Sequence, residues 1–230
     1  MWKGLHRQAR ILWRFRFHLL CAAAALLLWD TVWIKPFRVF VVMVHEMCHA
    51  VAALITGGEV LEMRTAWAEH GYTLSRGGWP MVIVSAGYLG SALLGAALIW
   101  SGALPQLQRL ALLLIGAATL GMTLAFTPAG GLDFAFGIAG GLGLICTAMY
   151  SARAGAGGAV WLGVMLCLYS LHDFRTDLWL YAERTDAGIL AAHLGLPWLA
   201  YPIAAAWVWL SLWVMYRAMA SLVKHEASRT

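Results

Sequence analysis

The chain has 230 residues, of which 62% are hydrophobic and only 12% are charged. A soluble domain of this length does not bury so large a share of apolar side chains, so the composition excludes a soluble globular protein and indicates an integral membrane protein. The formal net charge is +5, but the basic residues gather near the two ends and between apolar runs. That distribution fits orientation in a membrane and argues against a nucleic-acid partner.

The N-terminal segment, residues 1–17, is basic. Its first sixteen positions hold no acidic residue and five basic ones: Lys3, Arg7, Arg10, Arg14 and Arg16. Positive charge before a first apolar run is typical of the cytoplasmic side of a membrane. We therefore expect a cytoplasmic N-terminus, followed by a retained anchor, in a cell or inner membrane.

Seven apolar windows follow, most of them near the roughly 20 residues that cross a bilayer. They are His18–Ile34, Phe37–Thr56, Met81–Ser101, Leu107–Phe126, Leu132–Tyr150, Val160–Asp173 and Leu199–Met219. Because the connectors are short, the pattern predicts one all-α polytopic domain over residues 1–230, a bundle of six to seven transmembrane helices. Seven spans would place the polar tail, residues 220–230, on the opposite side of the membrane from the N-terminus, although both ends are basic. The alternative is six spans, with one of the seven windows lying flat on the membrane or re-entrant.

Two connectors have a character of their own. Residues 57–80 have glycine pairs at each end and β-favouring residues in rough alternation, which predicts an extramembrane hairpin or small sheet after the histidine-containing helix. Residues 172–198 combine three aspartates with several aromatic residues. We expect this second connector to form an amphipathic helix at the membrane interface.

The run from Phe40 to Gly58 contains two histidines and a glutamate among apolar side chains. His45 and His49 are one helical turn apart, so their imidazoles lie on one face and can bind one metal ion. Glu46 is rotated by about 100° around the helix, where it can reach a water on that metal. Three ionisable groups inside a membrane helix are costly, which indicates a functional use. This H-E-x-x-H arrangement predicts a zinc site with Glu46 as general base and general acid.

A catalytic zinc has three protein ligands and one open position, so a third ligand must come from elsewhere in the chain. It should lie at the depth of the C-terminal half of the histidine helix. Asp173 ends a predicted span of the same direction, and Asp177 lies one turn further on the same face. Asp133 begins a span of the opposite direction and reaches the same membrane side. Depth alone leaves these three aspartates open.

Small residues recur at spacings of three and four in two predicted spans: Gly87, Gly90, Ser91 and Gly95, then Gly137, Gly140 and Gly141. Such faces let helix backbones approach closely in lipid. We therefore expect tight helix packing at both, rather than a phosphate-binding loop.

Three stretches carry a likeness to a known family: HEMCHAVAALITGGEV from His45, SAGYLGSALLGA from Ser85, and YSLHDFRTDLWLYAERTDAGILAAHLGLPW from Tyr169. They resemble the site-2-protease-like intramembrane zinc metallopeptidases, in particular their compact bacterial and plant branch. The resemblance implies a Zn²⁺ cofactor and cleavage of a membrane-anchored protein substrate in or near the lipid bilayer.

The resemblance also bears on the third ligand. The wider family takes it from an LDG motif after a proline, and here Leu132 and Asp133 keep that spacing while Phe134 replaces the glycine. The compact branch has acidic positions at which this sequence has Asp173, Asp177 and Asp186. On this likeness we predict that Asp173 joins His45 and His49 as a zinc ligand, with Asp177 and Asp133 as alternatives.

Two other functions remain as hypotheses. The first is a catalytically silent membrane scaffold with a structural metal site. The second is a metal transporter, which the His and Asp residues within membrane segments would suit. A lapsed site has no reason to retain Glu46, which is not a ligand, and a transporter would need polar residues along several spans. No feature of the sequence specifies an oligomeric state.

Overall fold

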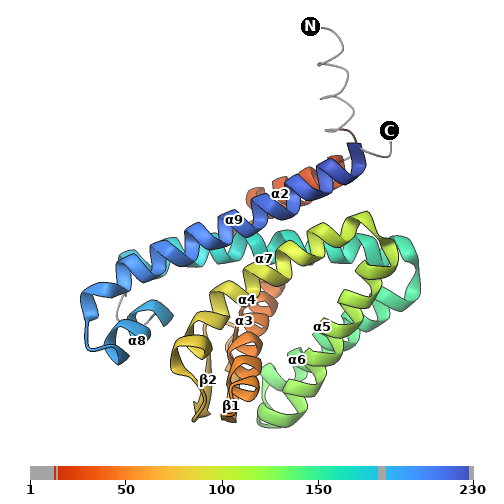
Figure 1. Ribbon diagram of the computed structural model, residues 1–230. Coiled ribbons are helices and arrows are strands. Elements are labelled where there is room, and N and C mark those ends of the chain that lie inside the picture. Colours follow the sequence, from red (N-terminus) through yellow and green to blue (C-terminus); the bar gives the residue numbers. More distant parts are fainter. Residues whose placement is uncertain (1–12, 14, 181–184, 228–230) are drawn as a thin grey trace, which may run out of the picture.

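The computed structural model describes residue 13, residues 15–180 and residues 185–227 (Figure 1), although the side chains of residues 103, 105, 173–180, 226 and 227 are not among the described ones. The described part consists of helices and one small sheet. Its elements are α2 (Arg16–Leu27), α3 (Lys35–Ile55), β1 (Glu59–Thr65), β2 (Gly71–Arg76), α4 (Pro80–Trp100), α5 (Pro105–Phe126), α6 (Leu132–Tyr150), α7 (Ala152–Leu180), α8 (Asp186–His193) and α9 (Ala200–Ala227), with short 3₁₀ turns at Ser101–Ala103 and Pro197–Leu199.

Six helices in the described part are long and apolar enough to cross a membrane: α3, α4, α5, α6, α7 and α9. The first predicted window, His18–Ile34, instead forms α2, which has only 12 residues. At 1.5 Å per residue such a helix is roughly 18 Å long, whereas the hydrocarbon core is about 30 Å thick. The predicted all-α fold is confirmed, with six spans and a hairpin after α3.

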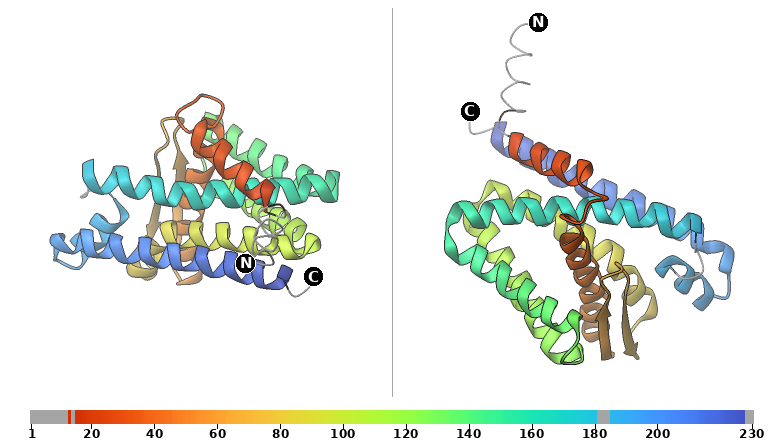
Figure 2. Two further views of the ribbon diagram at one scale, coloured as in Figure 1. Left: turned by 90° about the horizontal axis from the view of Figure 1, so that it is seen from above. Right: turned by 180° about the vertical axis from the view of Figure 1, so that it is seen from behind.

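Helix α3 is the central element of the bundle. Thirteen of its 21 residues are buried, and it contacts α4, α5, α6, α7 and both strands. Helix α7 crosses the N-terminal end of α3 (Figure 2), where Phe37 packs edge-on against Trp161 at 5.2 Å between ring centroids. Polar groups on α3 are therefore shielded from lipid by protein on several sides.

The predicted hairpin forms beside the C-terminal half of α3. Strands β1 and β2 are antiparallel, with a bulge between Val60 and Glu62. Gly57, Gly77 and Gly78 have positive φ angles, which glycine adopts without strain, so the glycine pairs mark the turns that enter and leave the sheet. The ion pair between Arg64 and Asp133, 3.1 Å long, ties β1 to the start of α6.

The segment at residues 172–198 differs from the single interfacial helix expected there. Helix α7 continues through Asp173 to Leu180, and its candidate membrane span ends at His172, next to the predicted end at Asp173. After residues 181–184, which lie outside the described part, α8 begins at Asp186 and packs against α4 and α9. Its interfacial position stays a prediction.

Candidate metal centre

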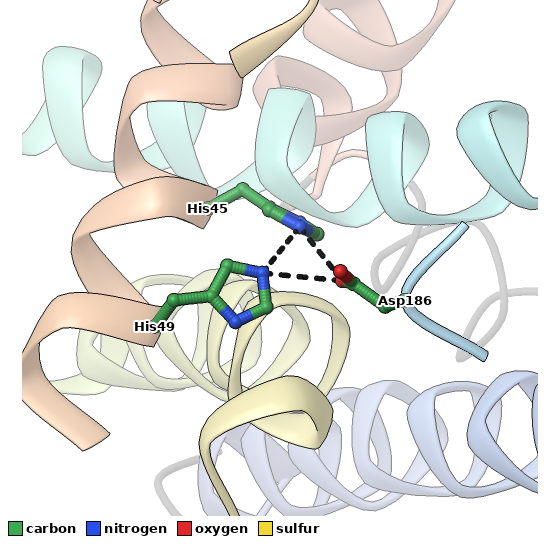
Figure 3. A group of neighbouring side chains, drawn as sticks. All are labelled: His45, His49 and Asp186. Carbon is green, nitrogen blue, oxygen red and sulfur yellow. Dashed lines mark hydrogen bonds and ion pairs between the residues drawn. The ribbon is translucent and has the colours of Figure 1, made fainter. Parts of the chain in front are cut away.

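Two imidazoles and one carboxylate converge between α3 and α8 (Figure 3). The Nε2 atoms of His45 and His49 are 3.0 Å apart, as expected for residues one helical turn apart. Asp186 Oδ2 lies 3.1 Å from Nε2 of His45 and 3.2 Å from Nε2 of His49. Three donor atoms from two helices thus form a nearly equilateral triangle.

The triangle has the size that one metal ion requires. Ligand atoms about 2.0–2.1 Å from a tetrahedral zinc ion lie roughly 3.3 Å from one another. Within the described residues, His45, His49 and Asp186 are the group of potential ligands brought together in this way. Two imidazole nitrogens and a carboxylate oxygen also match the donor types that catalytic zinc sites use.

Gly87 of α4 keeps the space beside the two histidines free. A Cβ atom at this position would lie 2.4 Å from Nε2 of both His45 and His49, close to a metal–nitrogen bond length. Any side chain here would therefore fill the space that an ion bound by these nitrogens requires. Gly87 has a role beyond the helix packing expected from sequence.

Two other glycines of α4, Gly90 and Gly95, allow close helix packing. A Cβ atom at Gly90 would lie 2.9 Å from Cys48 Sγ, and one at Gly95 would lie 2.9 Å from Cys167 Sγ. These contacts are tighter than ordinary van der Waals contact, so the α4 backbone approaches α3 and α7 closely. The packing prediction is confirmed at these two positions.

Helix α4 also orients the histidine rings. His49 Nδ1 donates a hydrogen bond to the Ile83 carbonyl oxygen at 2.7 Å, which leaves the lone pair of Nε2 available for a metal. The His45 ring meets Tyr88 edge-on with centroids 5.0 Å apart, and Tyr88 stacks on Trp207 of α9. Both rings are thus held in the plane that directs Nε2 toward Asp186.

Asp186 owes its position to α8. Thr185 caps this helix, because its Oγ1 accepts a hydrogen bond from the Gly188 backbone N–H at 3.1 Å. Ala187 and Leu190, on the buried face of α8, pack with Tyr88, Ala204 and Trp207. The cap and this cluster fix the first turn of α8, from which the carboxylate reaches the histidines.

The charge state of Asp186 suits a metal ligand. When no metal is bound, burial by itself raises the pKa of this carboxyl, but the charge of a protonated His49 and hydrogen bonds with both imidazoles outweigh it and hold the pKa below its usual value. The ionised carboxylate is the form that binds a metal.

Glu46 lies beside the triangle and outside it. Its side chain is 5% exposed, and it interacts electrostatically with His45, His49 and Asp186. Its Oε2 atom accepts a hydrogen bond from Thr73 Oγ1 of β2 at 2.8 Å. A buried carboxylate that lies next to three potential metal-ligand atoms, and is hydrogen-bonded to another residue, is the arrangement that the H-E-x-x-H pattern predicts.

A comparison with protein families agrees with this geometry. The family model described as Peptidase M50B-like matches residues 18–223, nearly the whole chain. The chain belongs to this family, the site-2-protease family of membrane metallopeptidases. The resemblance found in the sequence is confirmed, and with six apolar helices the chain is a multi-pass membrane protein. Comparisons with curated proteins and with solved structures give no significant match.

Within this M50B-like chain, the sequence-predicted third ligands fall in different places. Asp133 forms its ion pair with Arg64, and its Oδ1 accepts a hydrogen bond from the Phe134 N–H at 3.0 Å. Asp133 lies in the first turn of α6, at the predicted start of this span, but it does not belong to the described ligand group. Asp173 and Asp177 lie on α7, and their side chains are outside the described residues. The assignment of Asp173 as a ligand stays a prediction.

Asp186 is the residue that the sequence reading did not select. It stands on an acidic position of the family resemblance, but it lies within the connector 172–198 and not at the end of a predicted span. A further signal was available in Thr185, since a threonine followed by an aspartate is typical of a helix start. That signal indicates a short helix here and places Asp186 in its first turn.

Proposed function

We propose that this protein is an integral-membrane zinc endopeptidase that hydrolyses peptide bonds of membrane-anchored protein substrates. The observation that carries the proposal is the triangle of His45, His49 and Asp186, with 3.0–3.2 Å sides and a buried Glu46 beside it. Membership of a peptidase family with this combination supports hydrolysis over a purely structural role.

In this proposal His45, His49 and Asp186 hold the metal, with Asp186 in the place predicted for Asp173. Zinc bound there would supply Lewis-acid chemistry and lower the pKa of a bound water toward 7. The Ile83 carbonyl oxygen keeps the His49 ring in the ligand orientation. Glu46 accepts the proton of the attacking water and later passes it to the leaving amine. The open space at Gly87 leaves room for the reacting groups beside the histidines.

The hairpin is the proposed substrate-binding element. A transmembrane substrate helix must unwind before its peptide bonds can be attacked, and the resulting extended segment can pair with a free strand edge. The sheet has two strands, so each strand has one unpaired edge. Tyr72 and Leu74, both about half exposed, offer apolar contacts on the outer face of β2. The cytoplasmic N-terminus and the cell or inner membrane location are part of the same proposal.

The decisive experiment compares the parent protein with Glu46→Gln in detergent or vesicles. Zinc per chain is measured by atomic absorption, and cleavage is measured on a membrane-tethered polypeptide. We expect about one zinc per chain in both proteins and cleavage by the parent alone, because the glutamine cannot accept a proton. If Glu46→Gln cleaves as fast as the parent, the proposed mechanism is wrong. A parent with full zinc and no cleavage of any tethered substrate would support the scaffold function instead.

A further inference from the structure

Strand β2 presents one face to α3. Its residues alternate, with Gly71, Thr73 and Ser75 half-buried and the intervening residues exposed, as the two-residue period of a strand requires. Both strands contact α3, and they lie beside it (Figure 1). The inner face of β2 is thus the face turned toward Glu46.

Thr73 is in hydrogen-bond contact with Glu46 at two points. Its Oγ1 atom is 2.8 Å from Glu46 Oε2 and 2.9 Å from the Glu46 backbone oxygen. A threonine hydroxyl carries one proton, and a bond to an ionised carboxylate is stronger than one to a neutral carbonyl. Thr73 therefore donates to the carboxylate when Glu46 is ionised.

Gly71 shapes the space around the same side chain. A Cβ atom at Gly71 would lie 2.7 Å from Glu46 Cγ, 2.9 Å from Oε1 and 2.8 Å from the Arg64 carbonyl oxygen. The inner face of β2 thus leaves room for the glutamate at one residue and supplies a hydrogen-bond donor two residues later. Gly71 and Thr73 of β2 thus both contact the space occupied by the Glu46 side chain.

We propose that Thr73 is a positioning residue for the general base. By holding Oε2 of Glu46, the threonine hydroxyl restricts the rotation of the carboxylate and leaves Oε1 to exchange protons with water and the leaving group. Thr73 touches neither metal nor substrate and acts through Glu46 alone. This inference rests on the proposed peptidase function, and it makes the hairpin part of the catalytic apparatus as well as a place for substrate.

The test uses three variants of the full-length protein. Thr73→Val keeps the shape and the β-branched side chain but removes the hydroxyl, Thr73→Ser keeps the hydroxyl, and Ser75→Ala removes a hydroxyl from the same face of the strand. We expect Thr73→Val to lower kcat by about tenfold, the scale typical of a lost supporting hydrogen bond in a metal site, with KM unchanged. Thr73→Ser stays within about threefold of the parent and Ser75→Ala within about twofold.

Zinc content and melting temperature distinguish a positioning role of Thr73 from a role in folding or in metal binding. Both should match the parent in all three variants. The inference is overturned if Thr73→Val keeps the parent kcat, if Thr73→Ser is as slow as Thr73→Val, or if Thr73→Val loses zinc. If the proposed peptidase function itself is wrong, the result differs from these outcomes, because Glu46→Gln then cleaves the substrate as fast as the parent. An inactive Glu46→Gln with a fully active Thr73→Val refutes the role of Thr73 and leaves the peptidase intact.

Discussion

The carboxylate of Asp186 lies 3.1 Å from the imidazole of His45, although the two residues are 141 positions apart in the chain. One partner belongs to α3, in which 13 of 21 residues are buried, and the other to the first turn of an eight-residue helix. The proposed site thus joins a long, buried helix to a short one.

The third ligand can be identified by substitution. We expect Asp186→Asn to lower zinc affinity by at least about 100-fold, because loss of a direct ligand costs more than the 10- to 100-fold typical of outer residues. Asp173→Asn is the matched variant on α7 and should keep its zinc. Competition with a chromogenic chelator measures both affinities. The opposite ranking of the two variants would restore Asp173 as the ligand.

Gly87 should be intolerant of even one methyl group. The Cβ atom of Gly87→Ala would stand 2.4 Å from both Nε2 atoms, so we expect zinc content to fall at least about tenfold. Gly121→Ala is the control, since nothing lies within 4 Å of a Cβ atom at that position on α5. Circular dichroism should show unchanged helix content in both. Full zinc in Gly87→Ala would show that the space beside the histidines is not used.

The cap of α8 should influence metal affinity without touching the metal. Thr185→Ala removes the acceptor for the Gly188 N–H and destabilises the helix start by about 1 kcal/mol. If zinc binding requires that first turn, affinity falls roughly fivefold. Thr185→Ser keeps the cap and should bind zinc as the parent does. Equal affinity in the alanine and serine variants would contradict this coupling.

Asp133 should be dispensable for zinc. Because its carboxylate pairs with Arg64 at 3.1 Å, we expect Asp133→Asn to retain one zinc per chain and to change only the attachment of the hairpin to α6. Arg64→Met breaks the same ion pair from the other side and also removes the pair of Arg64 with Glu62, whose loss should matter little because both side chains are about a third exposed. The two variants should resemble each other in cleavage rate, and the double variant should resemble either single one. Loss of zinc in Asp133→Asn alone would instead make Asp133 a ligand.

Local rules predicted the parts of this structure that depend on neighbouring residues. The shared face of His45 and His49 follows from the helical period, and the hairpin follows from alternation between glycine pairs. The place of Asp186 beside the two histidines depends on how α8 packs against α4 and α9, which no period in the sequence encodes. Asp133 illustrates the difficulty, since its spacing fits a ligand while Arg64, distant in sequence, pairs with it.

The first apolar window shows a second limit of such rules. Its composition suits a membrane span, but the helix ends at Leu27, and the residues that follow fold back. Trp29 is 6% exposed and Ile34 is 2% exposed, because both join the core around α3 and α7. Hydropathy cannot distinguish a residue buried in protein from one facing lipid.

The packing of α8 against Trp207 bears on the order in which a cell makes this protein. Both histidines are translated early, but the carboxylate that completes the triangle is held by a helix near the C-terminus. A nascent chain that has not yet inserted α9 therefore has the two imidazoles without the packing that holds α8 in place. Under the proposed function, hydrolysis would thus require that α9 is already inserted.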